Sequence, residues 1–261
     1  MVFVFGAAGF VGSALVEHCR QNGIPHAGII RQNYAEYVGK ANDLFINAAG
    51  NSSKRLANSD PAADFEKNVA ATLKSILDFP TRRYVYLSTI DVYHDVRNPA
   101  INSETAPLRP ESMSRYGFHK YLAELLVRKY CPSHALLRLG GMVGPNLKKN
   151  AVYDIAVENR LFVHPQSKYQ YLHTARVAEV VFAAAGMSTT NLLLNVCGDG
   201  LVTPEQIQSW LGRNIIPKES PLEHYEINIE KLKSLFEVSS SEFSVQRYLR
   251  ELGVIGKSNE A

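Results

Sequence analysis

Tyr116 and Lys120 lie four residues apart in the run Tyr-Gly-Phe-His-Lys, a spacing that places both side chains on one face of a helix. An isolated phenol has a pKa of about 10, too high for easy proton exchange at neutral pH. A nearby ammonium group stabilises the phenolate and lowers that pKa. The pair therefore has the chemistry to give a proton to a carbonyl oxygen or to take one from an alcohol. This spacing alone is also typical of two side chains on the exposed face of a helix.

Two hydroxyl side chains, Ser88 and Thr89, follow a strand predicted at residues 84–87. In parallel α/β sheets, ligands bind beyond the carboxyl ends of the strands. We therefore expect both hydroxyls near the oxygen that Tyr116 would serve. Ser88 is a candidate substrate contact, although capping of a loop explains it better.

Three glycines come directly after the first predicted strand, Val2–Phe5, where a helix begins. Glycine permits a tight turn and a close approach of a pyrophosphate to the backbone, and the helix start offers free N–H groups and a partial positive charge. The spacing is G-x-x-G-x-x-G, whereas the general dinucleotide fingerprint is G-x-G-x-x-G. We predict a dinucleotide-binding loop made of Gly6, Gly9, Phe10, Val11 and Gly12.

The end of the second predicted strand decides which dinucleotide is favoured. A carboxylate there would bind the ribose hydroxyls and favour NAD. This chain instead has Arg31, whose guanidinium suits a 2′-phosphate. The sequence favours NADP as cofactor, with NAD as the alternative.

These residues need a scaffold, and short apolar runs alternate with helical patterns through the first half of the chain. Such alternation predicts βα units and a parallel sheet buried on both faces. After about Gly144 the pattern becomes irregular. We predict a Rossmann-type doubly wound α/β domain over residues 1–145 and a smaller C-terminal substrate lobe over 146–261, between which the chain can cross again. Strands are expected at residues 2–5, 27–30, 44–49, 84–87 and 135–139, and helices at 10–21, 61–77 and 115–130.

Composition narrows the class of protein. The 261 residues carry a net charge of +3 without a basic run, which argues against a nucleic-acid partner. The N-terminus is typical of a strand rather than a signal peptide, and no apolar stretch approaches a membrane span, so we expect a cytoplasmic protein. Cys19, Cys131 and Cys197 suit buried reduced thiols. His164 and His173 lack partners at metal-ligand spacing, so no metal site is predicted.

Taken together, these motifs resemble the extended short-chain dehydrogenase/reductase family, of the NAD-dependent epimerase/dehydratase type. The resemblance covers roughly the first 200 residues. It depends on the order of several motifs: the glycine loop, Asn47-Ala48-Ala49, Asn68 to Thr72, Ser88 to Tyr93, Tyr116 to Lys120 with Glu124, and Arg138 to Gly144-Pro145.

The resemblance implies roles for individual residues. Thr89, Tyr116 and Lys120 match the catalytic residues. Tyr116 and Lys120 would also contact the cofactor, where Lys120 would hold the nicotinamide ribose, and Ala48 and Ala49 would pass along it. The short span between Arg31 and Asn47 is similar to that of the dTDP-4-dehydrorhamnose reductases. Family members commonly dimerise through the helix of the Tyr-Lys pair, which makes a homodimer compatible with this chain.

Departures from the family's motifs bear on the class of substrate. Gly141 stands where family members often carry an Asn that helps bind a sugar nucleotide. Thr89-Ile90-Asp91 lacks the Thr-Asp-Glu order of the 4,6-dehydratases, which disfavours a dehydratase. The basic candidates for a substrate diphosphate are Lys148, Lys149 and Arg176.

The leading hypothesis is an NAD(P)-dependent reductase or epimerase of a nucleotide-linked sugar. A carbonyl reductase of a non-sugar substrate is the second, and it suits the missing Asn at Gly141. A dinucleotide-sensing protein without turnover is the third, disfavoured because the catalytic residues are retained.

Overall fold

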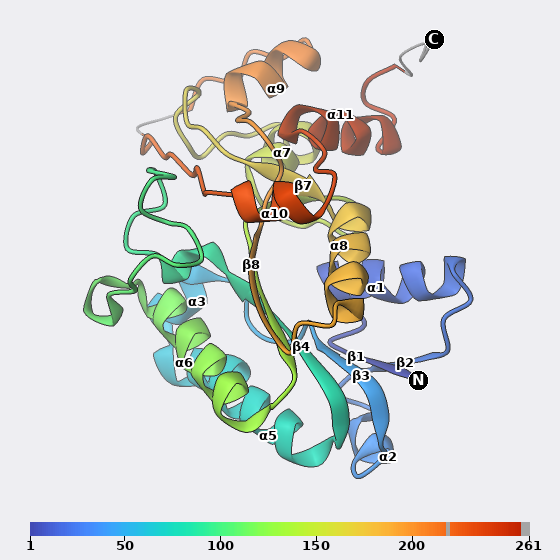
Figure 1. Ribbon diagram of the computed structural model, residues 1–261. Helices are drawn as coiled ribbons and strands as arrows, with labels where there is room; N and C mark the ends of the chain where they lie inside the picture. Colours follow the sequence, from blue (N-terminus) through green and yellow to red (C-terminus); the bar gives the residue numbers. More distant parts are fainter. Residues whose placement is uncertain (218–219, 257–261) are drawn as a thin grey trace.

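The computed structural model describes residues 1–217 and 220–256, and a six-stranded parallel sheet forms its centre (Figure 1). Its strands lie in the order β2-β1-β3-β4-β5-β8. Their bounds are Val2–Phe5 for β1, His26–Ile29 for β2, Asn42–Asn47 for β3, Thr81–Thr89 for β4, His134–Leu139 for β5 and Asn191–Val196 for β8. The order reverses between β1 and β3, so the carboxyl ends of these strands form the edge where ligands bind in such sheets.

Helices cover both faces of this sheet, as Figure 1 shows. On one face α1 (Phe10–Gln21) packs against α8 (Thr174–Gly186), and on the other α5 (Ala71–Asp78) packs against α6 (Arg115–Tyr130). Successive side chains of each strand point to opposite faces of the sheet. Val4 and Val85 belong to the core under α1 and α8, whereas Tyr84 and Phe45 belong to an aromatic core on the α6 side. The α/β doubly wound fold predicted from the sequence is confirmed.

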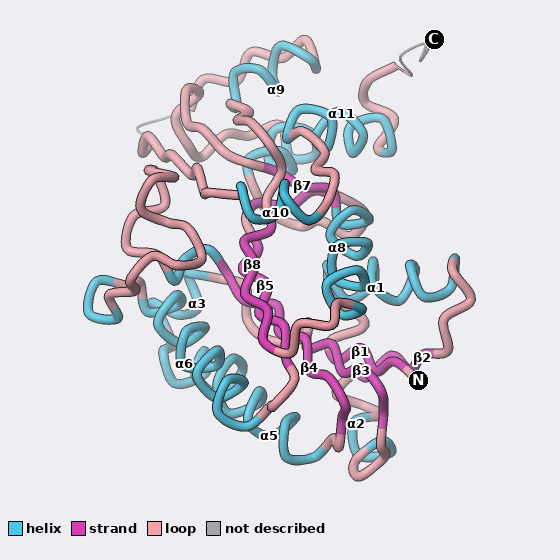
Figure 2. The backbone as a smooth tube through the Cα atoms, in the orientation of Figure 1, coloured by secondary structure: helices cyan, strands magenta, loops and turns pink. Residues whose placement is uncertain are grey.

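A smaller lobe lies beyond the carboxyl edge, where Figure 2 shows short helices joined by long loops. It contains a two-stranded parallel sheet of β6 (Gly141–Val143) and β7 (Tyr171–His173) and has its own apolar core. Its helices are α7 (Ala151–Tyr153), α9 (Pro204–Trp210) and α11 (Ser241–Glu251), whereas α10 (Glu230–Leu235) packs on β8 with Leu232 in the core of the main sheet. Between these elements the chain returns to the main sheet as β8, so the sheet takes a strand from beyond residue 145.

Three short helices between β2 and β5 complete the fold: α2 (Tyr34–Tyr37), α3 (Lys54–Ser59) and α4 (Pro61–Phe65). A π-helical turn, Glu66–Ala70, joins α4 to α5, so the helix expected over residues 61–77 is present with a bulge in it. Cys19, Cys131 and Cys197 are free and buried, as predicted. Among the described helices, none combines the length and apolar character needed to cross a membrane.

Candidate active site

A cleft of about 930 Å³ opens at the carboxyl edge of the sheet, between the sheet domain and the C-terminal lobe. Residues from the glycine loop, from the ends of β3 and β4, from α6 and from the lobe line it. The predicted site residues that it brings together are Gly9, Phe10, Val11, Ala48, Ala49, Ser88, Thr89, Tyr116, Lys120, Lys148 and Lys149. Residues far apart in the sequence thus meet in one place.

The Tyr-Lys pair lies on the first turns of α6, which starts beside the end of β4. Ser114 caps the helix by accepting a hydrogen bond from the Gly117 N–H at 3.1 Å. Gly117 lets the helix approach the strand end, because a Cβ there would lie 2.0 Å from the Asp91 carbonyl oxygen. This contact sets Tyr116 beside Thr89, and both residues line the cleft.

Lys120 is buried one turn after Tyr116 on α6. Its Nζ donates to the Leu87 carbonyl oxygen at 2.7 Å and lies 4.3 Å from the centre of the Tyr86 ring. Burial lowers the pKa of Lys120 to about 7, against the opposing effects of the Glu124 and Asp64 carboxylates. Lys120 can therefore gain or lose its proton near neutral pH.

Tyr116 has a raised pKa. Burial is the main cause, the negative charge of Asp91 adds to it, and a hydrogen bond with Thr89 works against it. The sequence predicts that the Lys120 ammonium lowers this pKa, but in the structure Lys120 points to Leu87 and the pKa of Tyr116 shifts upwards. The Tyr116 hydroxyl is consequently protonated at neutral pH, the state that an acid needs.

The two hydroxyls at the end of β4 have different partners. Thr89 Oγ1 accepts from the Asp91 N–H and donates to Asp91 Oδ2, both at 3.2 Å, and it faces the cleft. Ser88 Oγ donates to Glu124 Oε1 at 2.6 Å, and Glu124 forms a fully buried ion pair with Arg138 at 2.7 Å. The Ser88 hydroxyl proton is thus engaged below the cleft, which fits a structural role better than substrate binding.

The glycine loop can accommodate a pyrophosphate. Gly9 faces the cleft at the N-cap of α1, whose first turn, Phe-Val-Gly-Ser, has no acidic side chain to repel an anion. Gly6 has a φ of +85°, and a Cβ there would lie 2.7 Å from Ala49 N. Gly12 passes so close to Gly6 that a Cβ would lie 2.0 Å from its carbonyl oxygen. Gly6 and Gly12 therefore shape the loop, while Gly9 presents it to the cleft.

The basic residues predicted from the sequence separate in space. Lys148 and Lys149 line the cleft, and Lys149 Nζ donates to the Ser52 carbonyl oxygen across it at 2.8 Å. Arg176 lies on α8 in a separate small hollow, paired with Glu179, and does not belong to the cleft lining among the described residues. A substrate-binding role for Arg176 therefore has no support from its position. Arg31 is exposed in the turn after β2, also outside that lining.

Sequence reasoning missed the residues at the substrate end of the cleft. Lys54 Nζ pairs with Asp91 Oδ1 at 2.6 Å and donates to the Tyr225 hydroxyl at 2.8 Å. Tyr225 stacks on Tyr169, with ring centres 5.8 Å apart and planes 16° apart. Asp154 also lines the cleft, and burial together with Glu158 raises its pKa to about 6. Of these residues only Asp91 stood in a motif singled out from the sequence, Ser88 to Tyr93, because the tertiary fold alone brings Lys54 to Tyr225.

Comparison with known proteins decides the family. The sequence profile described as "NAD dependent epimerase/dehydratase family" matches residues 2–197. The chain belongs to this family. Membership supports an NAD(P)-dependent enzyme and agrees with the resemblance inferred from the motifs. A search of curated protein sequences finds no significant match.

Solved structures share the fold over nearly the whole chain. A UDP-galactose 4-epimerase is 23% identical with a TM-score of 0.77, covering 97% of this chain and 98% of its own. RMD from Pseudomonas aeruginosa, complexed with NADPH, is 19% identical with a TM-score of 0.81, covering 96% and 97%. The dTDP-4-dehydrorhamnose reductase from Bacillus anthracis, in complex with NADP, is 15% identical with a TM-score of 0.76, again covering 96% and 97%. These similarities establish the fold.

Proposed function

We propose that the protein is an NAD(P)-dependent oxidoreductase, a reductase or an epimerase, that acts on a nucleotide-linked sugar and uses Tyr116 as its acid or base. The observation that carries the proposal is the convergence of Tyr116, Lys120 and Thr89 in the same cleft as the glycine loop. Structures with this fold include epimerases and reductases of nucleotide-linked sugars.

The glycine loop and the backbone at Ala48 and Ala49 would hold the cofactor, which supplies a hydride donor or acceptor when bound. The protonated Tyr116 hydroxyl gives its proton to the carbonyl oxygen of a ketone, and in the reverse direction the phenolate takes the proton of an alcohol. Thr89 turns its hydroxyl from Asp91 to the same oxygen and stabilises the charge that develops there. Lys120, with a pKa of about 7, holds or releases a proton one turn after Tyr116 on α6. Tyr116 and Thr89 are only 8% and 6% exposed, which limits the water that reaches them.

The substrate end of the cleft supports a nucleotide diphosphate. Lys148 and Lys149 supply positive charge, and phosphates favour such donors. The stacked rings of Tyr169 and Tyr225 line the same cleft and offer flat aromatic faces. A base can stack on such faces, while the diphosphate lies by the lysines.

Fluorescence titration with NADPH and NADH tests the cofactor part of this proposal. We expect the wild type to bind NADPH more tightly and Arg31→Ala to remove the preference, because the guanidinium would lose its pairing with the 2′-phosphate. Arg20→Ala, at an exposed position of α1, is the matched control and should change nothing.

The outcomes separate the two reactions. NADPH preference lost in Arg31→Ala directs the search to keto-sugar nucleotides as substrates for reduction. Tight NADH binding that Arg31→Ala leaves unchanged, or cofactor that stays bound through purification, supports an epimerase. Absence of binding to either dinucleotide refutes the proposal.

A further inference from the structure

We propose that Asp64 is a positioning residue that ties residues 51–54, here called the cleft strap, to the catalytic helix α6. The inference deepens the proposed function and rests on it, since it concerns how the Tyr116 site is held together. Asp64 belongs to the short helix α4 and is completely buried, behind the cleft rather than in it.

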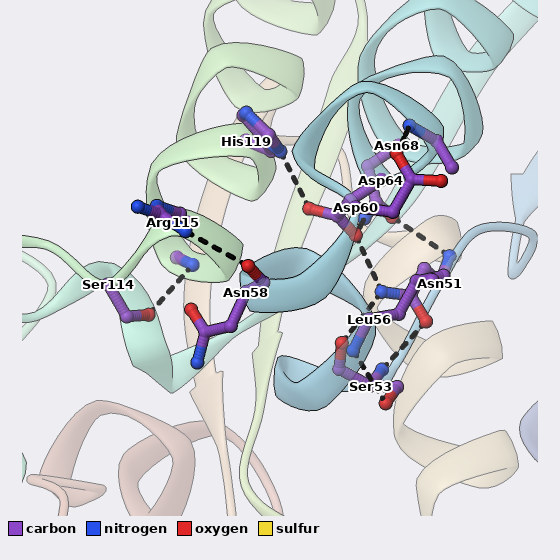
Figure 3. Close-up of polar contacts among 12 residues, drawn as sticks. Asn51, Ser53, Leu56, Asn58, Asp60, Asp64, Asn68, Ser114, Arg115 and His119 are labelled. Atoms are coloured by element: carbon purple, nitrogen blue, oxygen red, sulfur yellow. Dashed lines mark hydrogen bonds and ion pairs between the residues drawn. The ribbon is translucent and has the colours of Figure 1, made fainter.

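Three donors converge on the Asp64 carboxylate, as Figure 3 shows. Oδ1 accepts from Asn51 Nδ2 at 2.6 Å and from Asn68 Nδ2 at 2.8 Å, and Oδ2 accepts from His119 Nδ1 at 2.6 Å. An ionised carboxylate only accepts, so the His119 proton must lie on Nδ1. A buried carboxylate costs free energy unless its oxygens are hydrogen-bonded, and these bonds meet that need.

On one side this carboxylate fixes the cleft strap. Asn51, which it holds, donates its backbone N–H to Asn68 Oδ1 at 3.1 Å, and its side-chain oxygen accepts from Ser53 N at 2.8 Å. Gly50 permits this packing, because its φ is +124° and a Cβ there would lie 2.5 Å from Asn68 Oδ1. The backbone at the start of the strap is therefore anchored to Asp64 and Asn68 together.

The strap in turn joins the two walls of the cleft. Its Lys54 pairs with Asp91, the partner of Thr89, and with Tyr225 of the C-terminal lobe, at 2.6 and 2.8 Å. Its Ser52 carbonyl accepts from Lys149, also of the lobe. A shift of the strap would therefore move contacts on the substrate side of the reacting centre.

On its other side, Asp64 holds the catalytic helix. His119 lies between Tyr116 and Lys120 on α6, and its ring also packs edge-on against Phe65, with centres 5.6 Å apart. A second bond, from Arg115 to the Asn58 carbonyl at 3.0 Å, joins α6 to α3, the helix that begins at the last residue of the strap. Asp64 thus links α6, which carries Tyr116, to the cleft strap. Catalysis is sensitive to displacements of about 1 Å in the groups that act on the substrate.

Hydrogen exchange in the full-length protein without cofactor tests this link, using Asp64→Leu, His119→Phe and the double variant. Loss of a hydrogen bond to a charged group should speed exchange about tenfold or more in both residues 51–54 and the first turns of α6. The double variant should be no worse than Asp64→Leu, because both substitutions break one connection. Asp64→Asn, which keeps one oxygen and lets His119 use its other tautomer, should restore most of the protection.

Asp60→Ala is the matched control. It removes the N-cap of the same helix, where Asp60 Oδ1 accepts from Ala63 N at 3.0 Å, but touches neither the strap nor α6. It should speed exchange only around residues 60–65. If Asp60→Ala loosens the strap and α6 as much as Asp64→Leu does, or if Asp64→Leu leaves both segments protected, the positioning role is refuted.

Turnover provides the second readout. If the proposed function holds, Asp64→Leu and His119→Phe should each lower kcat about tenfold or more while Asp60→Ala leaves it unchanged. Exchange rates do not depend on any reaction, so a wild type that proves inactive would refute the proposed function and still leave the link between strap and helix to be judged from exchange.

Discussion

Replacing Lys120 by Met should make the protein more stable and, if Lys120 serves catalysis, inactive. Lys120 is 4% exposed, and burial takes its pKa from an ordinary value of 10.5 to about 7. Between these two values the unfolded chain binds more protons than the folded protein, so the free energy of unfolding rises with pH. The slope is about 1.4 kcal/mol per pH unit. Between about pH 7 and pH 9 the wild type should therefore gain about 2 kcal/mol from this group.

Methionine fills a similar volume and does not titrate. Near pH 7 the Met variant should be more stable than the wild type. The difference in their free energies of unfolding should shrink by about 2 kcal/mol towards pH 9, because Lys120 of the wild type loses its buried charge. Loss of the bond to the Leu87 carbonyl reduces the advantage at every pH without changing the slope.

Urea unfolding at several pH values, without cofactor, measures this difference. Lys129→Met, at an exposed position of the same helix, is the control and should show a difference from wild type that does not vary with pH. A pH-independent difference for Lys120→Met as well would mean that Lys120 keeps its full charge in the folded protein, and the reasoning from burial would be wrong.

Three further substitutions probe the scaffold and the substrate end. Gly12→Ala places a Cβ 2.0 Å from the Gly6 carbonyl oxygen, so we expect a loss of about 1–3 kcal/mol in urea unfolding and weaker dinucleotide binding by fluorescence. Glu124→Gln leaves the buried Arg138 without its counter-charge and should cost about 3–5 kcal/mol in the same unfolding assay. Lys54→Met should raise the substrate KM about tenfold through lost charge, with the cofactor Kd unchanged in parallel titrations. An unaltered value in any of these assays would contradict the corresponding contact.

Much of the fold could be predicted from local signals in the sequence. The glycines between Val2–Phe5 and Phe10–Gln21 predict where β1 ends and α1 begins. Pro132 and the apolar spacing before it predict α6 and its end. The start of α9 is a signal of the same local kind, because Thr203 and Gln206, three residues apart, form a capping box. Where a hydrogen bond or a turn lies within a few residues, the sequence carries enough information to place it.

The rest depended on contacts between distant segments. Strand β8 joins the sheet by pairing with β5, about sixty residues earlier in the chain, and its short apolar run is equally compatible with the lobe. The sequence makes Arg176 a candidate for the substrate diphosphate, but the fold places it in a separate hollow, where it donates to the Glu237 carbonyl about sixty residues later in the chain. The bonds from Asp64 to His119 and from Lys54 to Tyr225 join segments that no local pattern connects.

Nicotinamide absorbance in wild type and Tyr116→Phe tests the central claim most directly. Protein loaded with reduced cofactor is mixed with keto-sugar nucleotides, and protein loaded with oxidised cofactor with nucleotide sugars, so that hydride transfer in either direction is seen. We predict transfer in the wild type with at least one substrate, and a loss of about 10²–10⁴ in its rate in Tyr116→Phe at unchanged cofactor affinity. Transfer as fast in Tyr116→Phe as in the wild type, or firm cofactor binding with no transfer to any nucleotide sugar, would contradict the account.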